Sequence, residues 1–367
     1  MSSDSQYLAI GAHSRNLDRF CAGEGSQLML RNLQTGQRIA YLIEDGWTYN
    51  DPPGTIPLAN EVDVVVGERV TGLVFLPESP ILVASLADST VRLWNRETGE
   101  AIGEWPGHTM AVWAIAASQD GHTVVTGSAD RTIRVRIIHP ATGEIVNEQV
   151  LPETDLVQHL RLSNDGRTLV SILGSSLGDT TVHLWRQENG TWQRVAWEQV
   201  FPWDGPSAIN PEIFATEYHP TVAPRIQLSP DGTTVITGHN DGIIRLWNSE
   251  SGVRRLSLEN HQGPIRALAV SPDSQILASN ADGVVKLWNL ATGQLIRTLE
   301  TSGQLRFSQD GDSLLVHQTS YQTNQTEIWN WRSSTLLTTL PSNTVTLSTD
   351  GNTALSARAK AIEVYRR

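Results

Sequence analysis

Residues 228–252 read LSPDGTTVITGHNDGIIRLWNSESG, and residues 270–293 repeat the pattern as VSPDSQILASNADGVVKLWNLATG. Each copy has a Ser-Pro-Asp turn, two runs rich in apolar and β-branched residues, and a closing Ser-Gly or Thr-Gly turn. The closing glycines, Gly252 and Gly293, lie 41 residues apart. Self-similarity at such a period indicates a repeat architecture, in which one unit cannot bury its apolar faces alone. The pair therefore predicts further copies elsewhere in the chain.

Six other segments follow the same template, and a fourth short run such as Gln294–Glu300 separates one copy from the next. Alternation of Val, Ile, Leu and Trp with polar residues predicts half-buried β-strands. Asp-Gly, Asn-Gly and Thr-Gly pairs supply the tight turns between them. We therefore expect eight units of four strands and no helix. The six other segments end at Gly36, Gly99, Gly143, Gly190, Ser334 and the C-terminus.

Three units end in Leu-Trp-Asn with an aspartate six residues before the tryptophan: Asp88 and Trp94, Asp241 and Trp247, and Asp282 and Trp288. With this combination the sequence resembles the WD40-repeat family over nearly its whole length. The resemblance implies a closed all-β propeller in which each repeat gives about one four-stranded blade around a central channel. We expect residues 1–367 to form one such domain of eight blades. Seven blades are the alternative, because the first, seventh and eighth repeats are degenerate. Ring closure would need either Met1–Gln6 as an outer strand or a last blade of three strands.

The composition excludes several classes of protein. Of the 367 residues, 39% are hydrophobic and 18% are charged, which leaves enough apolar surface for a core. The formal net charge of -12 argues against a nucleic-acid or anionic-membrane binder, since phosphate groups need a basic surface. Cys21 is the only cysteine, which excludes an internal disulfide. The N-terminal MSSDSQ lacks the pattern of a secretory signal, and no apolar run is long enough to span a membrane. We therefore expect a cytoplasmic protein with no membrane insertion.

No metal or cofactor is predicted. The ten histidines show no spacing typical of metal ligands, and no glycine-rich phosphate loop occurs between a strand and a helix.

The resemblance also implies buried networks in which a histidine, a hydroxyl, an aspartate and a tryptophan hydrogen-bond within one blade. A catalytic triad is the alternative interpretation of these residues. We favour a structural role, because the constellation recurs in several repeats whereas catalysis needs one site. No catalytic residue is therefore predicted. By spacing, the network residues are His219, Thr237, Asp241 and Trp247, then His261, Ser279, Asp282 and Trp288, then His108, Thr126 and Asp130, with Arg136 at the tryptophan position.

Two inter-repeat segments are about 20 residues longer than the others, at about 45–66 and 201–220. Both are rich in proline and aromatic residues, including Trp47, Tyr49, Trp203 and Phe214. The resemblance implies that both loops open on the same face, called the top. Exposed aromatic residues on scaffold loops are typical of binding sites. The alternative is that each loop packs its aromatic side chains onto its own blade as an Ω-loop.

A second set of candidate binding residues comes from the family's pattern alone. In that family, positions near the start of the first strand point towards ligands at the top face. Here those positions hold Arg69, Trp113, Gln158 and Arg266. For Trp113, packing between blades is the alternative.

These observations favour a non-catalytic scaffold that binds protein or peptide partners through its top face and is monomeric when alone. An enzyme with polar residues or a metal in the channel is one alternative. A small-ligand or peptide sensor at the channel mouth is another. The style of the repeats is similar to that of bacterial members of the family.

Overall fold

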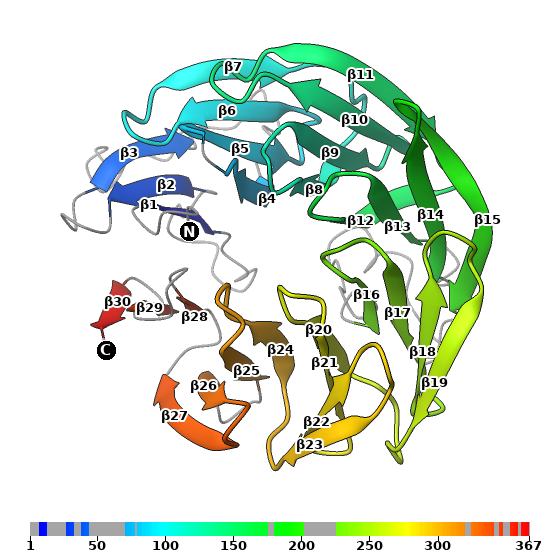
Figure 1. The fold of residues 1–367 in the computed structure, drawn as a ribbon. Helices are drawn as coiled ribbons and strands as arrows, with labels where there is room; N and C mark the ends of the chain where they lie inside the picture. Colours follow the sequence, from blue (N-terminus) through cyan, green and yellow to red (C-terminus); the bar gives the residue numbers. More distant parts are fainter. Residues whose placement is uncertain are drawn as a thin grey trace, which may run out of the picture. The chain divides into compact units, whose positions relative to one another are not determined.

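The computed structural model describes residues 7–12, 27–32, 38–43, 70–77, 79–174, 180–201, 225–319, 324–340, 345–347, 353–358 and 361–366. These residues form thirty β-strands and no α-helix (Figure 1). In the described part of the chain, no helix is long and apolar enough to cross a membrane. The predicted segments Met1–Gln6, 45–66 and 202–220, together with Cys21, lie outside the described residues.

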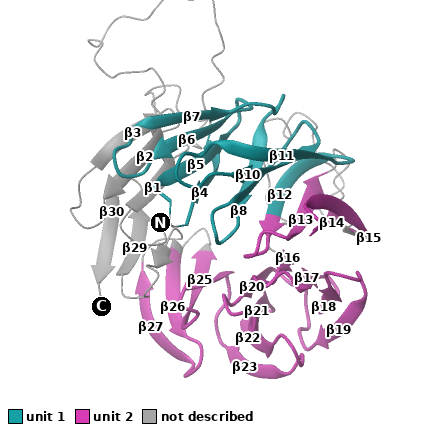
Figure 2. Cartoon of the chain, turned by 45° about the horizontal axis from the view of Figure 1, so that its top comes forward, with its two compact units in different colours: residues 1–160 teal, residues 161–367 magenta. Residues whose placement is uncertain are grey.

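The strands form antiparallel sheets of consecutive strands, six of them with four strands and two with three. The prediction of an all-β chain of four-stranded antiparallel units is therefore confirmed for six sheets. The chain divides into two compact units, residues 1–160 and 161–367, and the boundary falls within β12 (Figure 2). No described helix interrupts the succession of sheets in either unit.

In the first part of the chain, the sheets are β1–β2–β3, β4–β5–β6–β7 and β8–β11. Their strands are β1 Tyr7–Ala12, β2 Gln27–Asn32, β3 Arg38–Ile43, β4 Val70–Phe75, β5 Ile81–Leu86, β6 Val91–Asn95, β7 Ala101–Trp105, β8 Val112–Ala117, β9 Thr123–Ser128, β10 Thr132–Ile138 and β11 Ile145–Pro152.

Two further four-stranded sheets follow, β12–β15 and β16–β19. Their strands are β12 Leu156–Leu162, β13 Thr168–Gly174, β14 Thr180–Glu188, β15 Thr191–Phe201, β16 Ile226–Leu228, β17 Thr234–Gly238, β18 Ile243–Asn248 and β19 Arg254–Glu259.

The last three sheets are β20–β23, β24–β27 and the three-stranded β28–β30. Their strands are β20 Ala267–Val270, β21 Ile276–Ala281, β22 Val284–Asn289, β23 Leu295–Leu299, β24 Gln304–Phe307, β25 Ser313–Thr319, β26 Asn324–Asn330, β27 Thr335–Leu340, β28 Val345–Leu347, β29 Thr353–Arg358 and β30 Ala361–Arg366.

The first repeat differs from the predicted template. The template divides this repeat, residues 7–36, into three successive runs, YLAIGAHSRN, LDRFCAGEGS and QLMLRNLQTG, and so predicts that Gln27–Asn32 is its third strand. In the structure β1 pairs directly with Gln27–Asn32, from Tyr7 opposite Asn32 to Ala12 opposite Gln27. Gln27–Asn32 is therefore the middle strand of a described three-stranded sheet, β1–β2–β3, and not the third strand of four. Degenerate turn and strand signals in this repeat explain why its pattern was misleading.

The Ser-x-Asp turn that opens each copy has a clear physical role. The Ser229 hydroxyl donates to the Asp231 carboxylate at 2.5 Å, and the same oxygen accepts the Thr234 N–H at 2.9 Å. Gly232 follows with φ of 73°, in the left-handed region that glycine adopts without strain. The equivalent Ser271–Asp273 pair repeats the 2.5 Å contact. This motif therefore sets the tight connection between the first and second strands of the sheets β16–β19 and β20–β23.

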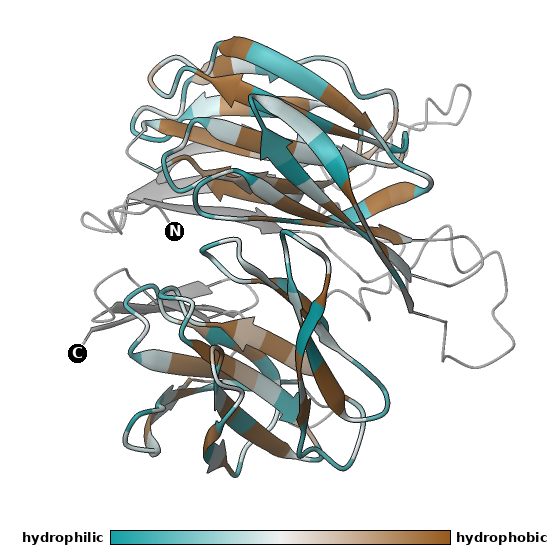
Figure 3. Ribbon diagram, turned by 45° about the vertical axis from the view of Figure 1, so that its right-hand side comes forward, coloured by the Kyte–Doolittle hydropathy of each residue, from teal (hydrophilic) through white to brown (hydrophobic). Residues whose placement is uncertain are grey.

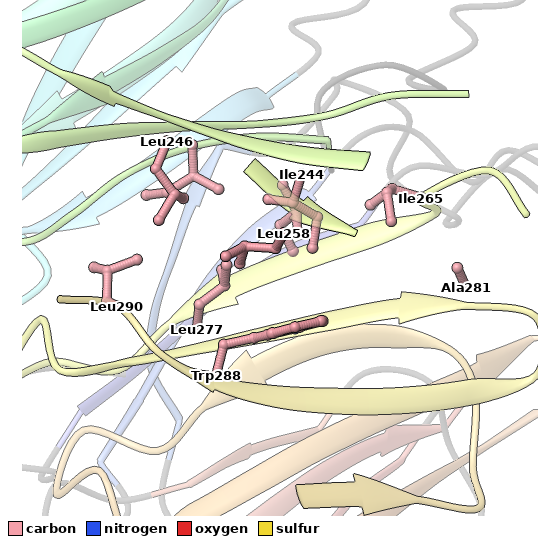
Figure 4. Packing of buried hydrophobic residues seen from close by; sticks show 10 residues of the cluster. Ile244, Leu246, Leu258, Ile265, Leu277, Ala281, Trp288 and Leu290 are labelled. Atoms are coloured by element: carbon pink, nitrogen blue, oxygen red, sulfur yellow. The ribbon is translucent and has the colours of Figure 1, made fainter. Parts of the chain in front are cut away.

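The core lies between consecutive sheets. Every residue of β5, β9, β13, β17 and β21 is buried, since each of these second strands has neighbours on both sides in its own sheet. In the second unit, Ile244 and Leu258 pack with Leu277 and Trp288 of the following sheet (Figure 4). In the first unit, Leu93 of β6 belongs to a cluster that extends to residues of β8 and β9. Figure 3 shows hydrophobic stretches, in brown, along many of the strands, as the pattern of the sequence predicts.

Candidate functional site

In the sheet β8–β11 the structure brings together the three residues predicted for the third repeat. His108 Nδ1 lies 2.9 Å from Asp130 Oδ2, and His108 Nε2 lies 2.9 Å from Thr126 Oγ1. The histidine is 7% exposed. Burial lowers the pKa of His108, and this effect outweighs the hydrogen bond and the charge of Asp130, which raise it. The imidazole is therefore neutral at neutral pH.

Asp130 is held by several donors besides the histidine. The backbone N–H groups of Thr109 and Thr132 donate to it at 3.0 and 2.9 Å, and the Thr132 hydroxyl donates at 2.6 Å. Burial tends to raise the pKa of Asp130, but the hydrogen bonds from Thr132 and His108 lower it, and the net shift is downward. Asp130 is therefore an anion whose acceptor sites are occupied by its own sheet.

Arg136 replaces the tryptophan of the predicted network and takes over its hydrogen bond. Its Nη1 donates to Thr126 Oγ1 at 2.9 Å and its Nη2 donates to the Pro106 carbonyl at 3.0 Å. Its Nε lies 2.9 Å from Glu148 Oε1 as an ion pair that lacks hydrogen-bond alignment. The guanidinium also lies 5.4 Å from the centre of the Trp105 ring.

The Arg136 side chain is fully buried. Burial lowers its pKa to about 10, while Glu148 acts in the opposite direction. Glu148 also pairs with Arg134 at 2.9 Å. The network in this sheet is therefore ionic, and it runs from Asp130 through His108, Thr126 and Arg136 to Glu148. The sequence shows Arg136 at this position, but only the fold shows what it binds.

In the sheet β20–β23 the equivalent network is neutral. His261 Nε2 lies 2.8 Å from Ser279 Oγ, and the Trp288 indole N–H donates to the same hydroxyl at 2.8 Å. The predicted link from His261 to Asp282 is wrong. Asp282 Oδ2 instead accepts the backbone N–H groups of Gln262 and Gly263, at 2.5 and 2.8 Å.

A one-residue difference in spacing explains this change. Asp282 follows His261 by 21 residues, whereas Asp130 follows His108 by 22. Asp282 also has φ of 55°, so its backbone turns left-handed at this point. Among the described residues, His261 Nδ1 has no hydrogen-bond partner. Burial lowers the pKa of His261 to about 4, and the positive charge of Lys286 acts in the same direction.

In the sheet β16–β19 a histidine that the sequence analysis missed holds the central hydroxyl. The Trp247 indole N–H donates to Thr237 Oγ1 at 2.9 Å, and His239 Nε2 lies 2.9 Å from the same oxygen. Burial lowers the pKa of His239 to about 4. The predicted His219 lies outside the described residues. His239 directly follows the strand that carries Thr237, and this position in the sequence could have identified it as a partner of the hydroxyl.

The aspartate of this sheet pairs with an arginine. Arg245 Nη2 donates to Asp241 Oδ2 at 2.7 Å. Arg92 makes the same contact with Asp88 in the sheet β4–β7, at 3.0 Å. Both pairs have the spacing of four residues, and the repeat places the arginine in the third strand each time. An aspartate at this position therefore has three observed uses, which are to bind a histidine, an arginine or backbone N–H groups.

The sheet β24–β27 contains a further network that the sequence analysis missed. His317 Nδ1 lies 2.7 Å from Thr326 Oγ1. Glu327 Oε2 accepts the Trp329 indole N–H at 2.9 Å and the Thr301 hydroxyl at 2.6 Å. Burial lowers the pKa of His317 to about 4. Here a glutamate accepts the indole N–H that a hydroxyl accepts in the sheets β16–β19 and β20–β23.

These polar groups are directed into the sheets and towards each other. The described residues contain no group of three or more histidine, cysteine, aspartate or glutamate side chains that could hold a metal ion. Neutral imidazoles bound to hydroxyls satisfy buried polar atoms, which is a stabilising role.

The candidate binding residues are only partly visible. Trp113 is half-buried on β8 and interacts with other residues, and Gln158 is half-buried on β12. Arg266 is exposed just before β20, and its backbone N–H donates to the Asn280 carbonyl at 2.7 Å. Trp113 and Gln158 belong to the first compact unit and Arg266 to the second. Arg69, Trp47, Tyr49, Trp203 and Phe214 lie outside the described residues.

A comparison with protein families identifies the repeats. The family described as "WD domain, G-beta repeat" matches residues 62–95, 99–136, 221–248 and 252–289. The first and third of these segments each contain three strands of one four-stranded sheet, β4–β6 and β16–β18. The second and fourth begin with the last strand of one sheet, β7 or β19, and continue with the first three strands of the next. The second segment ends at Arg136, and the last contains the His261, Ser279 and Trp288 network.

Curated relatives are distant and cover part of this chain. The chain is similar to the eukaryotic translation initiation factor 3 subunit I of Meyerozyma guilliermondii, with 26% identity over 52% of this chain and 51% of that protein. The same subunit of Debaryomyces hansenii is 29% identical over 50% of this chain and 49% of that protein. The chain therefore spans about half the length of these relatives. The apoptotic protease-activating factor 1 of Mus musculus is 25% identical over 61% of this chain and 19% of that protein.

Proposed function

This chain belongs to the WD40-repeat family, and from that premise we propose that it is a non-catalytic scaffold that binds protein partners. We further propose that residues 1–367 form one closed propeller of eight blades. Its binding surface is the face at which the first strands begin, framed by the long loops at about 45–66 and 201–220. We also propose that the protein is located in the cytoplasm.

One observation carries the non-catalytic part of the proposal. The polar constellations that could be mistaken for a catalytic site recur in several sheets, and their reactive atoms bind within the same sheet. Both ring nitrogens of His108 are bonded, and the Ser279 hydroxyl contacts both His261 and Trp288. A nucleophile and its base must be able to reach a substrate. Residues used in this way stabilise blades and do not react.

The relatives support the choice of partner. The translation factor relatives are named as a subunit, which is a component of a protein assembly. The net charge of -12 disfavours nucleic acid as an alternative partner. A protein partner therefore fits both the relatives and the charge.

Arg266 is the clearest probe of the proposed binding face. Its side chain is exposed, and among the described residues it has no hydrogen-bond or ion-pair partner. Arg254 on the outer strand β19 is also exposed and is a matched control. A charge reversal at either site should leave folding unaffected, because neither arginine stabilises a described neighbour through its side chain.

The test is quantitative capture of proteins from the native lysate by wild type, Arg266→Glu and Arg254→Glu. We expect a defined set of proteins to be retained by wild type and by Arg254→Glu, and to be lost with Arg266→Glu. A Trp113→Ala/Trp203→Ala double variant of confirmed fold should lose the same set. Equal capture by all four proteins would contradict the proposed face. If no protein is retained by any of them, the scaffold proposal fails and a small-ligand screen by thermal shift becomes the next experiment.

A further inference from the structure

The outer strand of each four-stranded sheet is paired on one side only. β7, β19, β23 and β27 are exposed over most of their length. An edge strand offers unpaired backbone N–H and C=O groups to any other strand that approaches it. Proteins commonly protect such edges with charged residues or proline.

Five of the six outer strands carry that protection and one does not. β27 reads TLLTTL and has neither a charged residue nor a proline. Short segments of high β propensity without charge or proline are typical of strands that pair with copies of themselves. The protecting residues of the other outer strands include Glu104 in β7, Glu148 and Pro152 in β11, Arg194 in β15, Arg254 and Arg255 in β19, and Arg297 in β23.

A bulge does not distinguish β27 from the others. Its register shifts between Ile328 and Trp329, so Leu337 has no partner residue on β26. The same shift leaves Ile296 unpaired in β23 and Ile102 unpaired in β7. These bulged residues are 42%, 41% and 42% exposed, respectively. The bulge therefore accounts for one exposed apolar residue in each strand, and the difference in β27 is its lack of charge.

β27 presents a second exposed apolar residue beside the bulge. Leu336 is 47% exposed, and Thr335, Thr338 and Thr339 are exposed as well. Only Leu340, at the end of the strand, is buried. The free edge is therefore a run of leucine and threonine.

We propose that β27 pairs with β27 of a second copy of this chain, antiparallel and about a twofold axis, which joins the two sheets β24–β27 into one. Self-pairing of β27 places no like charges opposite each other, whereas self-pairing of β23 about its central residue would place Arg297 opposite Arg297. With the twofold axis at Thr338, this residue lies opposite its own copy and Leu336 lies opposite Leu340, while Leu337 lies opposite Thr339. A cross-strand pair of threonines is favourable.

The pairing is closed and weak. Each copy uses the same strand on the other about a twofold axis, so the product is a dimer and not a fibre. Six residues on each side bury much less surface than a stable dimer needs, which is about 1,200–2,000 Å² in total. The net charge of -12 on each copy opposes association, so added salt should strengthen the dimer by screening this repulsion. This inference departs from the expectation that the chain alone is monomeric, and it does not depend on the proposed partner face.

Two threonines at the same register position provide a matched pair of variants. Thr339 lies opposite Glu327 in β27, and Thr298 lies opposite Lys286 in β23. Both are exposed. Thr339→Lys adds a charge to the unprotected edge, and Thr298→Lys adds the same charge to an edge that already has Arg297. Neither change removes a buried group, so both variants should fold.

Sedimentation velocity over a wide range of concentration and salt tests the proposal. We expect the mass of wild type to rise with concentration from 40.3 kDa towards that of a dimer. Thr298→Lys should behave like wild type, while Thr339→Lys should weaken association at least about tenfold, because the two added charges would lie at diagonally neighbouring positions of the joined sheet. A wild type that is monomeric at every concentration would overturn the proposal. So would equal loss of association in both variants, or a monomer whose β27 edge captures a strand of another protein.

Cross-linking gives a second, independent readout. In a Cys21→Ser background, Thr338→Cys lies close to the proposed twofold axis and should form a disulfide between two copies under mild oxidation. Arg297→Cys occupies the equivalent register position in β23 and should not. Equal cross-linking of the two variants would contradict pairing at β27.

Discussion

The sheets β8–β11 and β20–β23 are built from the same sequence template but satisfy their central hydroxyl differently. In the first sheet, Thr126 contacts a histidine and a buried arginine, and the arginine is balanced by Glu148. In the second, Ser279 contacts a histidine and an indole, and both partners are neutral at neutral pH. The two sheets therefore place a hydroxyl at the same position of the repeat. The group that donates to this hydroxyl differs, since it is a neutral indole in one sheet and a charged guanidinium in the other.

The largest expected effect is at Arg136. Arg136→Ala should lower the free energy of unfolding by about 3–4 kcal/mol, because it leaves a cavity and removes the donor to Thr126. Arg136→Trp should retain most of the stability, because an indole at this position donates to the hydroxyl in the sheet β20–β23. Urea denaturation measures both. If the tryptophan variant is as unstable as the alanine variant, the two networks are not interchangeable.

The second-largest expected effect is on the free energy of unfolding when the central hydroxyl of either sheet is removed. Thr126→Val leaves the charged Arg136 donor without its acceptor and the buried His108 Nε2 without its donor, and should cost about 2–3 kcal/mol. Ser279→Ala leaves only neutral partners, the Trp288 indole and the His261 imidazole, and should cost about 1–2 kcal/mol. Denaturation midpoints under identical conditions give the two values. Equal costs would show that the charge of Arg136 does not matter for the hydroxyl of Thr126.

Substitutions of Asp130 and Asp282 test the effect of the one-residue difference in their distance from the histidine of the same sheet. Asp130→Asn weakens a contact with His108 and should cost about 1–2 kcal/mol, since hydrogen bonds to charged groups are the stronger ones. Asp282→Asn keeps an acceptor for the backbone N–H groups, and asparagine tolerates a positive φ, so about 0.5 kcal/mol is expected. The control is the exposed Asp312→Asn. A larger loss for Asp282 than for Asp130 would reverse the comparison.

The smallest expected effect is on pH dependence. Because burial holds the pKa of His261 at about 4, below its ordinary value of 6.5, the unfolded chain binds the proton first. This histidine therefore contributes a stability that is full above pH 6.5 and is lost as the pH falls from 6.5 towards 4. His261→Gln should make the slope of stability against pH shallower in that window.

His108 is the matched comparison for this measurement. Its pKa is also lowered by burial, but Asp130 supports its protonated form. His108→Gln should therefore change the slope less than His261→Gln. Thermal unfolding followed from pH 7 to pH 4 compares the two slopes. An unchanged slope for His261→Gln would contradict the assigned cause.

The sequence predicted the strands well wherever its local signals were strong. The two copies that end in Trp247 and Trp288 contain the runs that became β17, β18, β21 and β22. The hydroxyls at Thr237 and Ser279 were predicted as network members, and each accepts the indole N–H of its own sheet. The first repeat was predicted less well, since β1 pairs directly with Gln27–Asn32.

The partners of the polar side chains could not be predicted in the same way. The sequence shows that the spacing between His261 and Asp282 is one residue shorter than in the other repeats. It does not show the consequence, which is that the Asp282 carboxylate binds backbone N–H groups and not the histidine. His239 replaced a more distant histidine as the partner of Thr237 in the described residues. Such choices depend on differences of a few ångström between competing partners, which spacing alone does not resolve.

The sequence by itself determined the all-β class, the repeat and most of the strand positions, because alternation and turn chemistry act over a few neighbouring residues. Only the tertiary structure decided that Arg136 takes the place of an indole, that bulges expose Leu337 and its equivalents, and that β27 presents an uncharged edge. Burial, register and the choice of hydrogen-bond partner depend on residues brought together from separate strands. They are therefore settled only when the sheets pack against each other.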